Sequence, residues 1–148
     1  MVTQNENKVL LIDDDPDCLD AVNQILQRAG YKTFTISDGR LASQIVTEHK
    51  INLVVVDYNM PEINGLQVIN EIKKARQDIP VLLMTAEPSD ELKIKSAKAG
   101  AFGFIPKPIN IPIFKRIVSK AIQSDGMRHV TVRRSFVFTR VIQWIKHK

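Results

Sequence analysis

The stretch "VLLIDDDPD" (residues 9–17) runs four apolar residues directly into three carboxylates, Asp13, Asp14 and Asp15. An apolar run without polar alternation is typical of a strand that is covered on both faces, as in a parallel sheet. Asp15 before Pro16 is a favourable helix N-cap, because proline at the first helical position needs no hydrogen-bond acceptor. The stretch therefore predicts a buried strand that leads into a helix, with like charges crowded between them.

Four further segments of the chain have the character of strands. "INLVVV" (51–56), "VLLM" (81–84) and "FGFI" (102–105) are continuously apolar, whereas "YKTFTI" (31–36) alternates and is typical of a strand nearer an edge. Apolar residues at helical spacing lie between or after these segments, at 19–29, 41–46, 66–72, 92–99 and 113–122. Five strands alternating with five helices predict a doubly wound α/β sandwich with a parallel sheet.

Polar residues follow the apolar runs at the points where the strands should end. They are Asp13 to Asp15 after the first run, then Asp57, Thr85 and Lys107. In such sheets ligands bind at the carboxyl ends of the strands, near a change in strand order. Clustered carboxylates suit Mg²⁺, and a hydroxyl with an ammonium suits a phosphoryl group. A solvated acidic rim without a metal is the simpler alternative for the carboxylates alone.

Composition and charge divide the chain into two parts. With 148 residues and 44% hydrophobic content, the chain is long enough for one domain with a proper core. Its net charge of +5 resides entirely in residues 125–148, after the turn-forming stretch "QSDGM". We therefore predict a neutral domain over residues 1–124 and a short basic tail over 125–148.

The tail pattern allows more than one structure. If residues 136–147 are helical, their large apolar side chains fall on one side and their basic ones on the other, although a strand over 130–138 is a rival. A basic amphipathic helix of this kind could pack on its own domain or on a second copy, and a membrane surface or nucleic acid ranks lower.

The cysteine content and the hydropathy of the chain indicate the cellular compartment of the protein. Cys18 is the only cysteine, which excludes a disulfide framework and favours a reducing compartment. No apolar run is long enough to cross a bilayer. These features predict a cytoplasmic protein.

The motifs "LLIDDDP", "VVVDYNMPEINGLQVINEIK", "LLMTAE" and "AGAFGFIPKP", with their spacing, resemble the receiver domain of two-component response regulators. The resemblance covers residues 8–123. It implies a flavodoxin-like sheet with strand order 2-1-3-4-5, and a phosphoprotein that takes a phosphoryl group from a sensor histidine kinase or a phosphotransfer protein. In such a protein the cation that the carboxylates require is Mg²⁺.

Residue roles follow from the same resemblance. Asp57 would be the phosphoryl acceptor and a metal ligand. Asp14 would bind Mg²⁺ directly, Asp13 would bind it largely through water, and Asn59 would offer its backbone carbonyl. Glu87, with Asn59, would flank the path of the water that removes the phosphoryl group.

The switch residues are also implied by the family. Thr85 would bond to the phosphoryl group and Lys107 would pair with its charge, while the bond from Lys107 to Pro108 would be cis. Phe104 would turn into the space that Thr85 vacates, although it stands where tyrosine is common and has no hydroxyl. The resemblance thus implies a signalling phospho-acceptor that catalyses its own phosphorylation and dephosphorylation and has no external substrate.

Two other functions compete with this interpretation. "IDDDPD" loosely matches the Asp-x-Asp-x-Thr start of haloacid-dehalogenase-like phosphatases through Asp13 and Asp15, but Asp17 stands in place of the threonine. A receiver-shaped interaction module that never takes phosphate is the second alternative. Turnover of an external phosphoester would support the first, and failure of acetyl phosphate to modify Asp57 would support the second.

Overall fold

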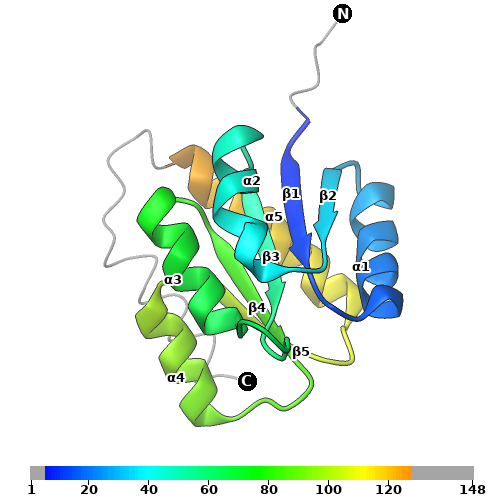
Figure 1. Cartoon of the computed structure of the whole chain (residues 1–148). Helices are drawn as coiled ribbons and strands as arrows, with labels where there is room; N and C mark the ends of the chain where they lie inside the picture. Colours follow the sequence, from blue (N-terminus) through cyan, green and yellow to red (C-terminus); the bar gives the residue numbers. More distant parts are fainter. Residues whose placement is uncertain (1–5, 128–148) are drawn as a thin grey trace, which may run out of the picture.

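A five-stranded parallel sheet forms the centre of the molecule (Figure 1). The structure is a computed structural model that describes residues 6–127. The strands are β1 (Lys8–Ile12), β2 (Lys32–Ile36), β3 (Leu53–Asp57), β4 (Val81–Thr85) and β5 (Gly103–Pro106), in the order β2-β1-β3-β4-β5. Every strand pair is parallel. The predicted fold class and strand order are therefore confirmed.

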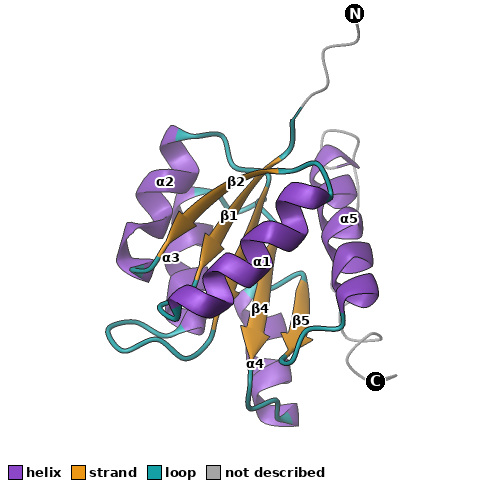
Figure 2. Cartoon of the chain, turned by 90° about the vertical axis from the view of Figure 1, so that its right-hand side faces the viewer, coloured by secondary structure: helices purple, strands orange, loops and turns teal. Residues whose placement is uncertain are grey.

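Helices cover both faces of this sheet. They are α1 (Pro16–Arg28), α2 (Ala42–Glu48) after the 3₁₀ turn η1 (Gly39–Leu41), α3 (Gly65–Ala75), α4 (Asp90–Ala99) and α5 (Ile111–Met127). Side chains of α1 and α5 share one apolar cluster with the strands, and those of α2, α3 and α4 share the other. Figure 2, turned by 90° from Figure 1, shows α1 in front of the sheet. The two clusters make the doubly wound, three-layered core.

Burial explains why the apolar runs form strands. All five residues of β3 and of β4 are buried, since both strands have neighbours on each side and helices on both faces. β2 lies at an edge and keeps two of its five residues exposed, which matches its alternating sequence. The strongest sequence signal thus belongs to the strands that carry the polar residues at their ends.

The start of α1 forms as its sequence predicts. Asp15 is the N-cap, and its side chain accepts a hydrogen bond of 3.0 Å from the backbone N–H of Asp17. Pro16 opens the helix, and Gly30 follows its end with a φ of 95°, a left-handed conformation that glycine adopts without strain. The helix therefore begins directly behind the carboxylates of the opening stretch.

Several residues assigned to buried helix faces are exposed. Leu41 is 47% exposed, Ile94 52% and Ile113 46%, so the apolar spacing misassigned these positions. In α5 the neighbouring Phe114 is fully buried instead of Ile113. In α4 the polar Ser96 is buried instead, because its hydroxyl donates to the Lys93 carbonyl at 2.8 Å. A satisfied hydroxyl can occupy a core position that hydropathy alone would not give it.

The carboxyl-terminal boundary also differs from the expected turn. α5 continues through "QSDGM" to Met127, because one glycine costs a helix only about 1 kcal/mol relative to alanine. The proposed structure of the basic tail lies outside the described residues from position 128 onward. Within residues 6–127, no helix is both long enough and apolar enough to cross a membrane.

Candidate functional site

Three carboxylates meet at the carboxyl edge of the sheet. Asp13 and Asp14 directly follow β1, and Asp57 is the last residue of the neighbouring strand β3. The parallel register pairs Ile12 with Val56, so both strands end at the same level. One oxygen from each carboxylate lies within 4.8 Å of the others. Asp13 and Asp57 are buried, with 2% and 5% exposure, whereas Asp14 is exposed.

The ammonium of Lys107 joins two of these carboxylates. Its Nζ lies 3.0 Å from Asp13 Oδ2 and 2.7 Å from Asp57 Oδ1. The Lys107 backbone N–H donates to the carbonyl of Thr85 at 2.7 Å, which fixes the start of this loop against the end of β4. The peptide bond from Lys107 to Pro108 is cis, as predicted. The loop after β5 therefore places the Lys107 ammonium beside the carboxylates of Asp13 and Asp57.

The charges in the site do not balance. Burial raises the pKa of Asp57, and the nearby charges of Asp13 and Asp14 raise it further, although the hydrogen bond from Lys107 lowers it. Burial alone would lower the pKa of Lys107, but its bonds to Asp57 and Asp13 hold that pKa above its ordinary value. Three carboxylates lie around the one ammonium of Lys107, so the described site carries more negative charge than this lysine compensates. A second cation at this site would relieve the excess.

The donor set fits Mg²⁺. All three candidate ligands are carboxylate oxygens, which hard divalent cations prefer, and the exposure of Asp14 leaves room for the waters that Mg²⁺ retains. Asn59 lies two residues beyond Asp57, in the loop that follows β3, and its side chain is exposed. Its role as a carbonyl ligand stays a prediction.

Gly65 allows that loop to close tightly behind Asp57. Its N–H donates to the carbonyl of Tyr58 at 2.9 Å. A Cβ at this position would stand 2.9 Å from the Asp57 carbonyl oxygen and 2.5 Å from a methyl of Leu83. Such contacts are too short for real side chains, so only glycine permits this approach. The Asn64-Gly65 pair of the motif thus shapes the segment next to the predicted acceptor.

The predicted switch residues occupy the neighbouring strands. Thr85 is fully buried at the end of β4, and its Oγ1 accepts a hydrogen bond of 3.1 Å from the backbone N–H of Glu87. The Glu87 side chain is exposed. Phe104 is fully buried in the cluster shared with α2, α3 and α4, and Lys93 Nζ lies 5.9 Å from its ring centroid. The phenyl ring of Phe104 is therefore packed in the core of this structure.

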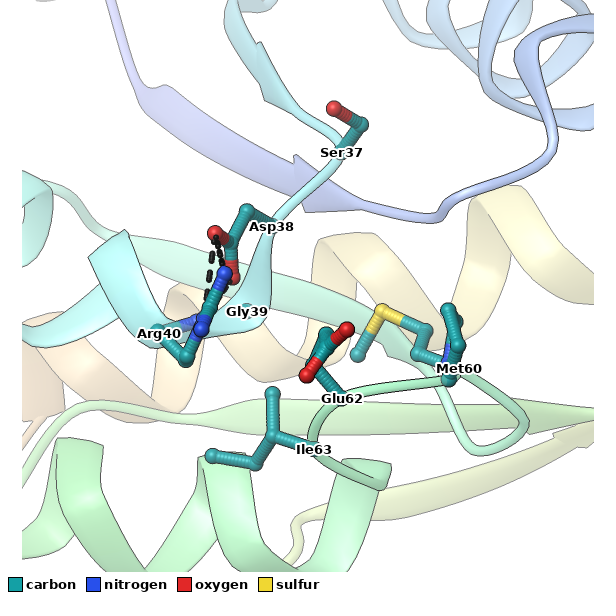
Figure 3. Close-up of a pocket in the computed structure, with 8 residues that line it drawn as sticks. Ser37, Asp38, Gly39, Arg40, Met60, Glu62 and Ile63 are labelled. Carbon is teal, nitrogen blue, oxygen red and sulfur yellow. Dashed lines mark hydrogen bonds and ion pairs between the residues drawn. The ribbon is translucent and has the colours of Figure 1, made fainter.

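Two features near the site were not predicted from the sequence. The first is the Cys18 thiol, interpreted above only through compartment: burial raises its pKa to about 11, with smaller contributions from Asp13 and Lys107. Its place in the first turn of α1, just after the carboxylates, was the available signal. The second feature is an open pocket of about 150 Å³ between residues 37–40 and 60–63 (Figure 3). Arg40 at its rim is paired with Asp38.

Comparisons with known proteins agree on one family. The family model described as response regulator receiver domain matches residues 9–119. The transcriptional regulatory protein GlrR of Escherichia coli is 28% identical over 141 residues, covering 91% of this chain and 32% of that protein. The DNA-binding transcriptional regulator NtrC of Rhizobium meliloti is 34% identical over 120 residues, covering 81% and 25%. The chain thus spans a quarter to a third of the length of these relatives.

Solved structures give the same result. The Vibrio cholerae chemotaxis protein CheY4 superposes with a TM-score of 0.74 at 29% identity, covering 78% of this chain and 98% of that one. A response regulator receiver domain protein from Clostridium thermocellum superposes with a TM-score of 0.77 at 28% identity, covering 82% and 98%. The matched residues include the whole carboxylate and lysine constellation, and the chain belongs to the response regulator receiver domain family.

Proposed function

We propose that Asp57 accepts a phosphoryl group, in a Mg²⁺-dependent reaction, from a sensor histidine kinase or a phosphotransfer protein. The observation that carries this proposal is the Lys107 ammonium between Asp13 and Asp57, in a cluster of three carboxylates. A solvated acidic rim would not bury two carboxylates around one lysine, because unpaired buried charges are costly.

The residues of the chain have distinct parts in this reaction. An oxygen of Asp57 forms the new bond to phosphorus, while the bond from phosphorus to the nitrogen of the donor histidine breaks and its electron pair stays on that nitrogen. Lys107 pairs with the charge of the incoming group. Asp13, Asp14 and Asp57 would hold Mg²⁺, which offsets negative charge on the phosphoryl oxygens. Together these cations lower the repulsion between a carboxylate and a phosphoryl group.

Thr85 and Phe104 provide the proposed switch. The Thr85 hydroxyl, which accepts from the Glu87 N–H, would turn to donate to the phosphoryl group. Space would then open beside β5 for the ring of Phe104, which is buried on that strand. Phosphorylation adds about −1.5 to −2 charges at neutral pH, and this is the force that draws the hydroxyl inward.

The direct test is the mass of the full chain after treatment with acetyl phosphate. We expect a gain of one phosphoryl group with Mg²⁺ present and none when a chelator removes it. An equal gain after chelation would contradict the metal-dependent mechanism. Steady release of phosphate from a simple external phosphoester would instead support the haloacid-dehalogenase-like alternative.

Asn59 and Glu87 are predicted to set the lifetime of the phosphorylated state. Both side chains are exposed, and they lie two residues beyond Asp57 and Thr85, where polar groups could orient an attacking water. The family resemblance implies a lifetime of seconds to minutes. Asn59→Arg should lengthen it by about tenfold, because its bulk obstructs the water. Phosphate release from purified phosphorylated protein measures the rate, with Asn70→Arg on the exposed face of α3 as the control. A half-life of hours in the wild type, or no change in Asn59→Arg, would contradict this role.

The wider function of the protein is inferred from the family. We propose that the chain is a cytoplasmic signalling component with no external substrate, which catalyses its own phosphorylation and dephosphorylation. Self-docking or dimerisation through the basic tail stays a prediction, and it ranks above binding of nucleic acid or of a membrane.

A further inference from the structure

The ammonium of Lys93 lies over the aromatic ring of Phe104. Its Nζ is 5.9 Å from the ring centroid, within the distance of about 6 Å at which the negative face of a ring attracts a cation. Phe104 is fully buried on β5, whereas Lys93 on α4 is half-buried. The lysine therefore covers the buried ring from the solvent side, with its charge near the ring face.

The backbone of α4 fixes the point from which this lysine extends. The N–H of Lys93 donates to the carbonyl of Ser89, the N-cap of the helix, at 3.0 Å. The Lys93 carbonyl accepts a hydrogen bond of 2.8 Å from the hydroxyl of Ser96, which is itself buried. The preceding residue, Leu92, packs in the same apolar cluster as Phe104. Lys93 thus leaves the helix at a fixed position beside the cluster that holds the ring.

Lys93 forms no ion pair within residues 6–127. On the same helix, by contrast, Lys95 pairs with Glu91 at 2.8 Å. A phenyl ring has no hydroxyl, so the attraction of a cation to its face is the polar interaction that it can offer. In this part of the chain, the Phe104 ring is therefore the partner that the structure gives to the Lys93 charge.

We propose that Lys93 is a positioning residue for the switch, whose ammonium holds the Phe104 ring in its resting position. This inference rests on the proposed function, in which the ring moves into the space that Thr85 vacates. Thr85 is fully buried, so a ring that moves toward it moves deeper into the domain and away from Lys93. Phosphorylation would thereby break the contact and return the ammonium to solvent. The position of the ring would thus be expressed on the surface of α4 as a change in the place of one positive charge.

The test compares substitutions in the full chain. Lys93→Met removes the charge but preserves much of the stem, Lys93→Arg restores a cation that can stack on the ring, and Phe104→Leu removes the ring. Lys98→Met, at an exposed position of the same helix, is the matched control. Two quantities are measured: the rate of phosphoryl incorporation from acetyl phosphate with Mg²⁺, and the NMR signal of the Lys93 ε-methylene protons, which the ring shifts when they lie over its face.

We expect Lys93→Met to speed phosphoryl incorporation by about two- to fivefold, the effect of losing one cation–π contact that favours the resting position of the ring. Lys93→Arg should keep a rate near that of the wild type, and Lys98→Met should not change it. In Phe104→Leu, the addition of Lys93→Met should have no further effect on the rate, because the ring is already absent.

The NMR signal reports the contact itself. In the wild type, the ε-methylene signal of Lys93 should lie upfield of the signals of exposed lysines, and in Phe104→Leu it should move toward them. When acetyl phosphate and Mg²⁺ are added to the wild type, the signal should move in the same direction, since the ring leaves the lysine.

Three results would overturn the proposal. One is a Lys93 signal that is the same in Phe104→Leu and in the wild type. Another is an equal gain in rate from Lys93→Met with and without the Phe104 ring, which would show that the charge acts by another route. The third is a Lys93→Met rate that equals or falls below the wild-type rate, which removes this inference alone. If the wild type takes no phosphoryl group at all, the proposed function fails and this inference fails with it.

Discussion

Asp57→Asn should abolish phosphoryl incorporation, leaving the mass of the full chain unchanged after treatment with acetyl phosphate and Mg²⁺. The asparagine side chain keeps the size of the aspartate but has no carboxylate oxygen to attack phosphorus. The matched control is Asp15→Asn, two residues from Asp13, where an amide still caps α1 and no metal role is assigned. This control should gain one phosphoryl group as the wild type does.

Loss of incorporation in Asp57→Asn should not be accompanied by unfolding. The pKa of Asp57 is raised mainly by burial, so its charged form is less favourable in the folded chain than in the unfolded chain. Removing that charge should therefore leave the unfolding temperature without Mg²⁺ at or above the wild-type value at neutral pH. A variant that folds and still gains a phosphoryl group would show that another residue, such as the neighbouring Asp13 or Asp14, is the acceptor.

The sheet was predictable because its signals are local and strong. Each buried strand is a continuous apolar run, and the polar residue at its end marks where the ligand edge begins. Parallel pairing then brings Asp13, Asp57, Thr85 and Lys107 to that edge without any further information. The strand order itself came from the family resemblance, since no periodicity distinguishes one order of parallel strands from another.

Helix faces and side-chain contacts were less predictable. Ile94 fits an apolar stripe in the sequence, yet half of it is exposed, because α4 buries a different set of residues, Leu92, Ser96 and Ala97. The hydrogen bond from the Arg76 guanidinium to the Ile51 carbonyl joins positions 25 residues apart. It depends on how the end of α3 is oriented against the segment before β3, and sequence spacing does not contain that orientation.

Lys107→Met should lower both the rate of phosphoryl incorporation and the stability of the fold. The methionine preserves much of the aliphatic stem but leaves the buried carboxylates of Asp13 and Asp57 without their ammonium. Breaking a fully buried pair costs about 3–5 kcal/mol, and we expect about 2–3 kcal/mol here because the Lys107 side chain keeps 19% exposure. Denaturant unfolding without Mg²⁺ at neutral pH measures this loss of stability. The control is Lys115→Met, at an exposed position of α5.

The loss of stability in Lys107→Met should become smaller as the pH falls. Without Lys107, the pKa of Asp57 loses the hydrogen bond that lowers it and rises further. As pH falls from neutral toward this raised pKa, which lies above about 3.9, the folded variant binds protons more readily than the unfolded chain and gains stability. The stability difference from the wild type should therefore narrow in acid.

The stability difference between Lys107→Met and the wild type should also become smaller at alkaline pH. The pKa of Lys107 is raised in the folded wild type, so its contribution is complete below its unfolded pKa of about 10.4 and is lost as pH rises through the folded value. Added Mg²⁺ should also narrow the difference at neutral pH, since it supplies the missing charge to the same carboxylates. A difference that stays constant with pH and with Mg²⁺ would mean that Lys107 stabilises the fold through packing, and that its ammonium is not what balances the carboxylates of Asp13 and Asp57.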